Sequence, residues 1–229
     1  MVRRTKQEAE ETRARIFDAA ERVFHEKGVA HASLEDVAAA AKVTRGAIYW
    51  HFKDKGELFD AMMQRVMLPP EAIEEGAECP LGQATSLAQL KAAMLSVLER
   101  TASDPHMARI FEIAYHKCEY VGDAVGVRER HVASQAECMK TIESGFRACI
   151  ASGELPSSVD PKVASMGAMS LVSGVISNWV LDPGRFALRK HAATLVDIYF
   201  RGLESAPRPA ARRKAPRKDA AHAPATARR

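Results

Sequence analysis

The chain contains few of the features that build sheets, zinc sites or membrane spans. Aromatic residues make up 6% of its 229 residues, and β-branched and aromatic residues form no strand-like runs. No stretch approaches the roughly 20 apolar residues of a membrane span, and the charged N-terminus lacks the apolar segment of a signal peptide. The four cysteines have neither Cys-x-x-Cys pairs nor zinc-finger spacing, so we expect reduced thiols packed in helices (Cys79, Cys118, Cys138 and Cys149). These absences predict a cytoplasmic, all-α protein without metal or other cofactor.

The net charge of +4 is unevenly distributed along the chain. The segment from Ala206 to Arg229 carries eight basic residues and one acid, so the rest of the chain has a net charge of −3. This segment is rich in Ala, Pro, Arg and Lys and has almost no large apolar residue, which predicts a disordered basic tail at 206–229. Overall charge is therefore no evidence for DNA binding, whereas residues 42–55 hold four basic residues against one acid.

Apolar residues recur at helical spacing through the rest of the chain. Helix starts are indicated by Ser33 and Thr44 as capping residues, and by Asp54 with Glu57 as a capping box. Gly28 suits the left-handed turn that ends a helix. The pattern predicts about nine helices, at roughly 8–27, 34–41, 45–51, 55–67, 87–102, 105–120, 123–152, 161–181 and 186–204.

Two short helices joined by a tight turn at residues 33–51 have the layout of a helix-turn-helix. The second helix of this motif lies in the major groove of DNA. Arg45 can donate two hydrogen bonds to guanine or pair with phosphate, and Gly46 and Ala47 permit close approach to the duplex. Ile48 and Phe52 should pack inward. The candidate DNA-binding residues of this segment are Thr44, Arg45, Gly46, Ala47, Tyr49, Trp50, His51, Lys53 and Lys55.

The segment from Thr44 to Lys55 closely resembles the signature of TetR-family regulators, and Phe24, Gly28-Val29 and Ser33–Ala38 fit the same pattern. The resemblance implies an N-terminal three-helix DNA-binding domain at 1–55 and a helical ligand-binding and dimerisation domain at 56–205. Neither domain includes the basic tail. The resemblance also adds four residues to the candidates for DNA binding, namely Arg3, Arg4, Lys6 and Ser33.

One subgroup, the repressors of multidrug efflux pumps (the acridine- and toluene-efflux regulators), is similar over most of residues 1–203. The similar stretches are Arg3–Ala9, His116–Tyr120 and Trp179 with Asp182-Pro183. This resemblance implies a dimeric repressor of an efflux operon, involved in antibiotic resistance, that binds a palindromic double-stranded operator. Small hydrophobic compounds would release it from DNA.

The subgroup's ligand pocket corresponds to positions that also lie on single helical faces. They are Met67, Val97, Phe111, Tyr115, Cys138, Ile142, Met169, Val172, Ser173 and Ile176. Ser173 and the Tyr115 hydroxyl would supply polar contacts. Because Met67 and Ser173 are uncharged where the subgroup often has an acid, a preference for cationic ligands is not expected.

The last two predicted helices, 161–181 and 186–204, should form the homodimer, since a helix that is apolar nearly all round must be covered. In the second of them Ala192, Leu195, Val196, Ile198 and Tyr199 are the apolar candidates.

Two alternatives stay open at this stage. A dimeric DNA-binding regulator without a small-molecule inducer would use the basic tail for non-specific phosphate contacts. An enzyme could use His116, Cys118 and Glu119, but on one helix these residues do not converge as a catalytic triad must. No Gly-rich phosphate loop supports an enzyme either.

Overall fold

The chain folds into nine α-helices, without strands, over the residues that the structure, a computed structural model, describes: 6–67, 84–119 and 125–206. The helices are α1 (Lys6–Lys27), α2 (Leu34–Ala41), α3 (Arg45–His51), α4 (Lys55–Met67), α6 (Leu87–Ser103), α7 (Pro105–His116), α8 (Val125–Ala151), α9 (Pro161–Leu181) and α10 (Leu188–Glu204). The predicted all-helical fold is confirmed. The predicted disordered tail lies, from residue 207 on, outside the described residues.

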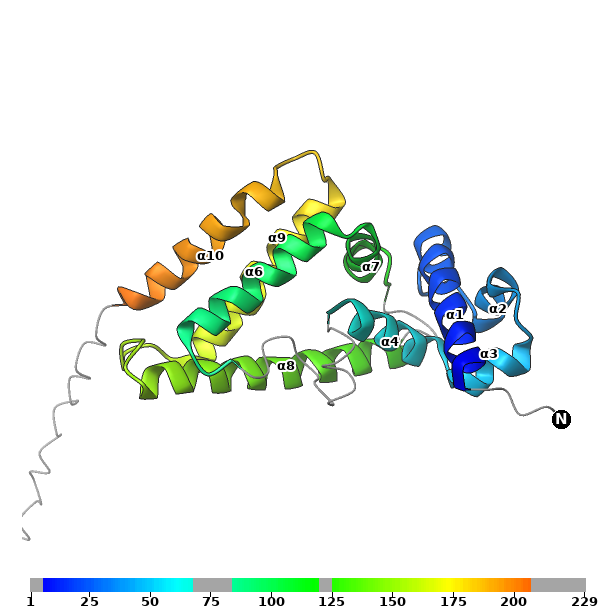
Figure 1. Cartoon of the computed structure of the whole chain (residues 1–229), viewed down its shortest axis with the longest axis horizontal. Coiled ribbons are helices and arrows are strands. Elements are labelled where there is room, and N and C mark those ends of the chain that lie inside the picture. Colours follow the sequence, from blue (N-terminus) through cyan, green and yellow to red (C-terminus); the bar gives the residue numbers. More distant parts are fainter. Residues whose placement is uncertain (1–5, 68–83, 120–124, 207–229) are drawn as a thin grey trace, which may run out of the picture.

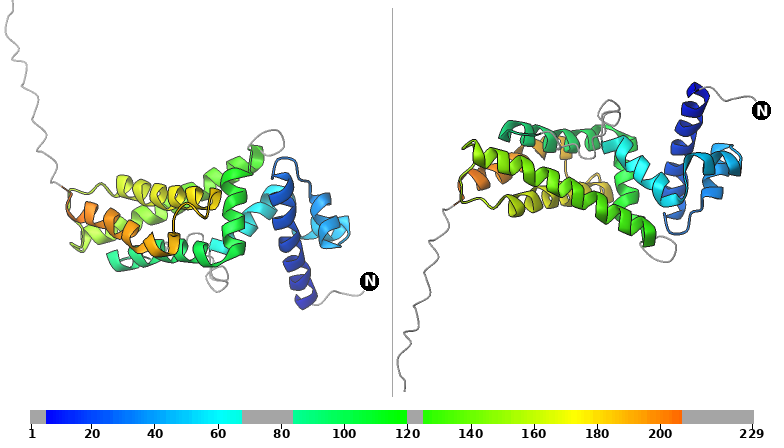
Figure 2. Two further views of the ribbon diagram at one scale, coloured as in Figure 1. Left: turned by 90° about the horizontal axis from the view of Figure 1, so that it is seen from above. Right: turned by 90° about the horizontal axis from the view of Figure 1, so that it is seen from below.

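The molecule is elongated, with α1, α2 and α3 at one end of its long axis (Figure 1). Seen from above and below, α4 leads from these helices into a body built from α6 to α10 (Figure 2). In that body α10 packs on α6, and α9 packs on α7 and α8. The C-terminal ends of α8 and α10 lie at the opposite end of the molecule from the N-terminal helices.

Local capping bonds fix the starts of the first helices. The Ser33 hydroxyl accepts from the Asp36 N–H (3.1 Å), and the Asp36 carboxylate accepts from the Ser33 N–H (3.0 Å). Asp54 accepts from the Glu57 N–H, but the Glu57 carboxylate accepts from the N–H of Lys53 rather than that of Asp54. The predicted capping box at α4 is therefore shifted by one residue in one of its two bonds. Since all these bonds span four residues or fewer, the sequence alone predicts these helix starts.

The observed ends of α1, α6, α8 and α10 lie within one or two residues of the predicted bounds. The clearest difference is α7, which ends at His116 rather than near residue 120. Lys117 leaves the helix because its carbonyl accepts the N–H of Val29 (2.9 Å) and its ammonium donates to the carbonyl of His25 (3.0 Å). A tertiary contact with the loop after α1 thus ends the helix.

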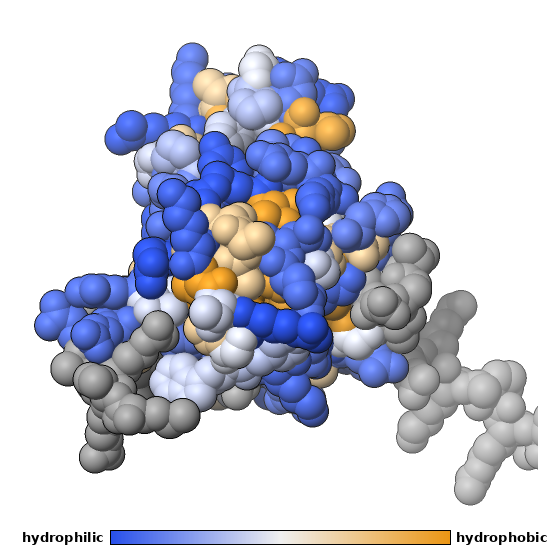
Figure 3. Space-filling view, turned by 90° about the vertical axis from the view of Figure 1, so that its right-hand side faces the viewer, coloured by the Kyte–Doolittle hydropathy of each residue, from blue (hydrophilic) through white to orange (hydrophobic). Residues whose placement is uncertain are grey.

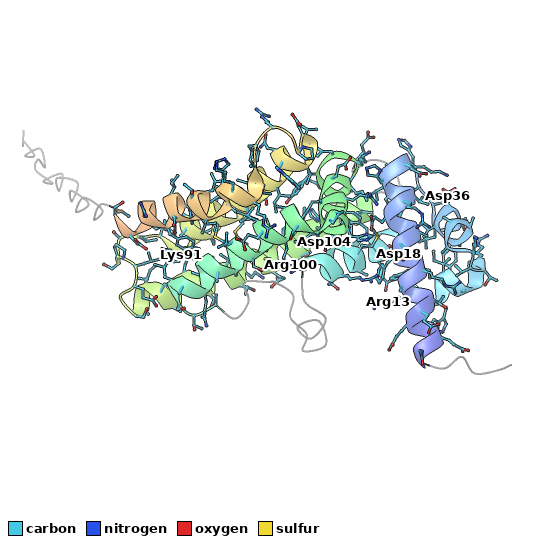
Figure 4. All side chains as sticks on the ribbon, turned by 45° about the horizontal axis from the view of Figure 1, so that its top comes forward. Arg13, Asp18, Asp36, Lys91, Arg100 and Asp104 are labelled. Carbon is cyan, nitrogen blue, oxygen red and sulfur yellow. The ribbon has the colours of Figure 1, made fainter. Side chains whose placement is uncertain are left out.

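Buried ionic contacts join α1 to α7. Glu21, 5% exposed, accepts from Arg109 (2.7 Å) and lies 2.9 Å from Nδ1 of His106. Figure 4 labels Asp18 on α1, with Arg100 and Asp104 at the end of α6; these three side chains line a small cavity of about 220 Å³ at the same junction. The N-terminal helices are therefore fastened to the body through α7 as well as through α4.

The length and composition of α9 contradict the expectation that no stretch of the chain could span a membrane. Among the described residues it is the one helix that is long and apolar enough by length and composition, a weak criterion that core helices also meet. In this fold α9 packs against α7, α8 and α6. Three of its large apolar side chains, Val163 (64% exposed), Met166 (50% exposed) and Leu181 (64% exposed), remain uncovered in the single chain.

Candidate functional site

Helix α3 presents aromatic side chains at the end of the molecule. Trp50 is 73% exposed and Tyr49 is 43% exposed, whereas Ile48 and Phe52 are buried, as predicted. The Trp50 and His51 rings meet edge to face, with their centroids 4.6 Å apart. The surface at this end of the molecule is mostly hydrophilic, with small apolar patches (Figure 3).

A carboxylate from α2 orients the polar groups of α3. Glu35 pairs with Nε of Arg45 at 3.1 Å and accepts a hydrogen bond from the Tyr49 hydroxyl at 3.1 Å. The Arg45 guanidinium also lies over the Tyr49 ring, 5.5 Å from its centroid. Glu35 was not among the predicted site residues, and the acid-rich first turn of α2 was the one sequence signal that pointed to it. The arrangement holds both side chains in place while leaving the Arg45 side chain 75% exposed.

The small residues of α3 leave its outer surface open. A Cβ added at Gly46 would meet nothing within 4 Å, so the fold itself does not require glycine there. Thr44 caps the helix by accepting from the Ala47 N–H at 3.1 Å. Gly46 is exposed, as are Thr44 and Arg45 beside it, and this favours close approach by another molecule.

The remaining DNA-binding candidates differ in their exposure and in their contacts within the fold. Lys53 is exposed, but the Lys55 ammonium donates to the carbonyls of Ala30 (2.8 Å) and Ala32 (3.3 Å), where it ties α4 to the loop after α1. Ser33 is half-buried in its cap. Arg3 and Arg4 lie outside the described residues, as does the side chain of Lys6.

A cavity of about 300 Å³ lies between α4, α7, α8 and α9. Seven of the ten predicted pocket residues line it, namely Phe111, Tyr115, Cys138, Met169, Val172, Ser173 and Ile176. Val97 and Ile142 are buried but do not line it, and the Met67 side chain lies outside the described residues. The Phe111 and Tyr115 rings are stacked along one wall, 5.9 Å apart.

The polar end of this cavity was not among the predicted site residues. The additional lining residues are Asp60, Met63 and Gln64 on α4 and Arg130, His131, Ala133, Ser134 and Gln135 on α8. Residues 60, 63 and 64 share a helical face, as do 131, 134, 135 and 138, so their spacing was a usable signal. The cavity wall therefore contains an acid, Asp60, at a position other than the uncharged Met67 and Ser173.

Burial and ion pairing set the charges at the polar end. Burial raises the pKa of Asp60 to about 6, although Arg130 opposes the change. Burial also acts on Asp54, but hydrogen bonds from the Glu57 and Gly56 N–H groups and from Arg130 outweigh it and lower the pKa of that carboxyl. Burial raises the pKa of the Tyr115 hydroxyl, opposed by its hydrogen bond with Ser173, and lowers the pKa of His131. Both side chains are therefore neutral near pH 7.

The cysteines differ from the expectation of four reduced thiols. Cys138 is disulfide-bonded, whereas Cys118 and Cys149 form no disulfide bond. Cys79 lies outside the described residues. The geometry around Cys118 gives no support to the enzyme alternative, since Nε2 of His116 is hydrogen-bonded to the Ser177 carbonyl at 2.9 Å.

Two families match this chain over separate segments. Residues 16–62 match the family described as bacterial regulatory proteins, tetR family. Residues 85–205 match the C-terminal region of MAATS-type transcriptional repressors. The first segment contains α2 and α3 with most of α1 and α4, and the second contains the body of the molecule.

Characterised relatives match along most of their length. The chain is 35% identical to the transcriptional regulator TtgR of Pseudomonas putida over 207 residues, which are 90% of this chain and 98% of TtgR. It is 37% identical to AcrR of Shigella flexneri over 206 residues, 87% of this chain and 94% of AcrR.

Solved structures show the same fold. One is NalD, the secondary repressor of the MexAB-OprM multidrug efflux pump in Pseudomonas aeruginosa (TM-score 0.74, 34% identity, 86% of this chain and 99% of NalD). Another is a complex of SmeT with triclosan (TM-score 0.71, 28% identity, 84% of this chain and 91% of SmeT). A family of transcriptional regulators leaves no place for the enzyme alternative. The chain belongs to the TetR family, as a helix-turn-helix DNA-binding repressor with a MAATS-type C-terminal region, related to repressors of multidrug efflux pumps.

Proposed function

We propose that this protein is a ligand-responsive repressor that binds a palindromic operator as a dimer and controls a multidrug efflux pump operon. A small hydrophobic compound in the cavity releases it from DNA, in the cytoplasm where the operator lies. One observation carries the proposal: the largely apolar cavity is bounded by α4, which begins only three residues after α3 ends. Its volume of about 300 Å³ is at the lower end of the range of small-molecule pockets.

The proposed ligand class is supported by relatives. SmeT has been solved in complex with triclosan, a small aromatic compound, and NalD is described as a repressor of a multidrug efflux pump. In the present chain aromatic, thioether and aliphatic side chains from α7 and α9 form the apolar wall. Ser173 and Tyr115 place hydroxyl groups within it.

The proposed DNA contacts are those of the exposed groups on and beside α3. Arg45, Tyr49 and Trp50 are candidates for contact with base edges and the sugar-phosphate backbone, and Lys53 for contact with phosphate. A phosphate contact from Lys55 would require its ammonium to leave the two carbonyls that it now binds. We therefore give Lys55 a structural role, tying α4 to the loop after α1.

The proposed dimer uses α9 and α10. Their exposed apolar side chains, Val163, Met166, Leu181 and Ile198, are between 50% and 64% exposed in the single chain. Ala192 and Val196, which were candidates for the interface, are buried within the subunit, where α10 packs on α6. A twofold interface would place two α3 helices to match the two halves of a palindrome.

Ligand and DNA would then be negatively coupled. A ligand that fits one arrangement of α4, and DNA that fits another, each shift the population towards the arrangement they bind better.

The test is a gel shift at physiological salt with the full-length protein and DNA from upstream of its own gene, in excess competitor DNA. Triclosan, hydrophobic antibiotics and plant phenolics would be added in turn. A cavity-filling variant, Ser173→Phe, should bind DNA and resist release. Its matched control, Ser144→Phe at an exposed position on α8, should be released like wild type.

Three results are distinguishable. A specific shift that some compounds reverse in wild type and the control, but not in Ser173→Phe, supports the proposal. A specific shift that no compound changes supports a dimeric regulator without a small-molecule inducer. Absence of any specific shift overturns the assignment of this DNA as the operator.

A further inference from the structure

A single arginine links the polar end of the cavity to the first turn of α4. In Arg130, on α8, Nη2 lies 2.6 Å from Oδ1 of Asp54 and Nη1 lies 3.4 Å from Oδ2 of the same carboxylate. Its Nε lies 3.1 Å from Oδ2 of Asp60, which lines the cavity together with Arg130 itself. The guanidinium rests directly on Gly56, where an added Cβ would come within 1.7 Å of Nη2. The Arg130 side chain is thus held at the cavity wall by two carboxylates and by the absence of a side chain at position 56.

The two carboxylates that hold Arg130 are not equivalent. Asp54 caps α4 and also accepts the N–H groups of Gly56 (2.9 Å) and Glu57 (3.0 Å), so its charge is well compensated. Asp60 is partly buried further along α4, with a side chain 24% exposed, and this burial raises its pKa to about 6. A guanidinium group carries a positive charge at any pH near neutrality. This end of the cavity therefore combines a permanent positive charge with a negative charge that a proton can remove.

This asymmetry distinguishes acidic from basic ligands. An organic cation that paired with Asp60 would lie beside the permanent charge of Arg130, whose Nε already lies 3.1 Å from that carboxylate. An organic anion that paired with Arg130 would face Asp60, whose charge a proton can cancel. The hydrogen bonds to Asp54 use two of the five N–H groups of the guanidinium, and the buried Nε faces Asp60 at ion-pair distance without a hydrogen bond, so donors remain for a ligand oxygen.

We propose that Arg130 selects aromatic weak acids for this cavity, with a carboxylate or phenolate oxygen of the ligand replacing Asp60 on the guanidinium while Asp54 stays in place. The aromatic part of the ligand packs on Phe111, Met169 and Val172 of the apolar wall. The inference rests on the proposed ligand-binding function of the cavity and adds the chemical class of the ligand and the residue that recognises it.

The exchange balances in protons. A ligand that enters as the neutral acid loses the proton of its O–H group, and the Asp60 carboxylate that leaves Arg130 gains one. The titratable or charged groups that act on Asp60 or share its cavity are Asp54 just before α4, Glu57 on α4, Arg130 and His131 on α8, and Tyr115 on α7. His131 and Tyr115 stay neutral near pH 7, because burial lowers the pKa of the first and raises that of the second.

The test compares three probes that share one aromatic body: biphenyl-4-carboxylate, biphenyl-4-carboxamide and biphenyl-4-methylammonium. Their affinities for the full-length protein are measured by calorimetry at pH 7. Wild type should bind the carboxylate at least tenfold more tightly than the amide, and the ammonium most weakly. Arg130→Gln should reduce the preference to twofold or less, and Arg130→Lys, which retains the charge, should keep part of it. The matched control is Arg128→Gln, an exposed arginine one half-turn earlier on α8, which should behave as wild type.

Equal or tighter binding of the amide or the ammonium by wild type would overturn the proposal, as would a tenfold carboxylate preference that survives in Arg130→Gln. If none of the three probes binds while other compounds release the operator, the ligand class is wrong and the proposed function stands. If no compound of any charge binds the cavity, both proposals fail.

Discussion

The contact between Glu21 and α7 predicts an unequal response to removal of its two ends. Glu21 has a side chain that is 7% exposed, whereas its partners Arg109 and His106 are 43% and 69% exposed. Removing the partner of a buried charge strands that charge, and costs about 3–5 kcal/mol when the site is fully enclosed. Removing the buried charge itself leaves two side chains that water can solvate.

Arg109→Met should therefore be more destabilising than Glu21→Gln. Because Arg109 is partly exposed and His106 remains 2.9 Å from Glu21, we reduce the enclosed-site cost to about 2–3 kcal/mol for Arg109→Met. Glu21→Gln keeps an acceptor oxygen for the two partly exposed partners but removes the negative charge from both hydrogen bonds. We expect this change to lower the free energy of unfolding by about 1 kcal/mol. Glu21→Gln changes the buried partner of this ion pair, and Arg109→Met removes the partly exposed one.

The cost of Arg109→Met should also depend on pH. The hydrogen bond to Glu21 raises the pKa of His106 above its ordinary value of 6.5. A raised histidine pKa contributes stability below 6.5, and this contribution is lost as the pH rises through the higher folded value. Since His106 is the remaining partner of Glu21 in this variant, the destabilisation should be smaller at pH 6 than at pH 8.

Urea unfolding followed by circular dichroism measures these differences, with all variants at one protein concentration because a dimer's stability depends on it. Arg22→Met, an exposed arginine next to Glu21 on α1, is the matched control and should change stability by less than about 0.5 kcal/mol. Equal losses in Arg109→Met and Glu21→Gln, or the same loss at pH 6 and pH 8, would refute the reasoning.

Three further predictions concern α3, the dimer and Asp60. Trp50→Ala should change the free energy of unfolding by less than about 0.5 kcal/mol, since Trp50 is 73% exposed. The same variant should bind the operator at least tenfold more weakly in a gel shift. Unchanged affinity would show that Trp50 does not contact DNA. Ile198→Asp should convert the proposed dimer to a monomer in light scattering, and a dimer that persists in this variant would place the interface elsewhere. The pKa of Asp60 is raised from 3.8 to about 6, so between about pH 4 and pH 6 the folded chain holds a proton on Asp60 that the unfolded chain has lost. Stability should therefore fall as the pH rises from about 4 to 6, and Asp60→Asn should flatten this fall in urea titrations; an unchanged slope would contradict the assignment.

The DNA-binding end was predictable because its determinants are close together in the sequence. Ser33 caps α2 through Asp36, and Thr44 caps α3 through Ala47, so the helix-turn-helix follows from bonds that span three residues. The inward packing of Ile48 and Phe52 follows from helical spacing in the same way. Lys55 shows the limit of such reasoning, because its ammonium binds carbonyls 23 and 25 residues away and no local pattern indicates this.

The cavity was only half predictable. Phe111 with Tyr115, and Met169 with Val172, could be assigned from helical faces and from the family resemblance. The polar end could not, because Arg130 meets Asp54 across 76 residues of sequence and its place depends on how α8 packs against α4.

The sequence by itself determined the helices, the recognition motif and the family, since capping bonds, helical periodicity and a contiguous signature are all local properties. Only the tertiary structure decided which charges face the cavity, that Glu35 orients Arg45 and Tyr49, and that Lys55 is engaged within the fold. A side chain's charge is encoded at one position, but its partner, its burial and hence its pKa depend on segments that the fold brings together from far apart in the chain.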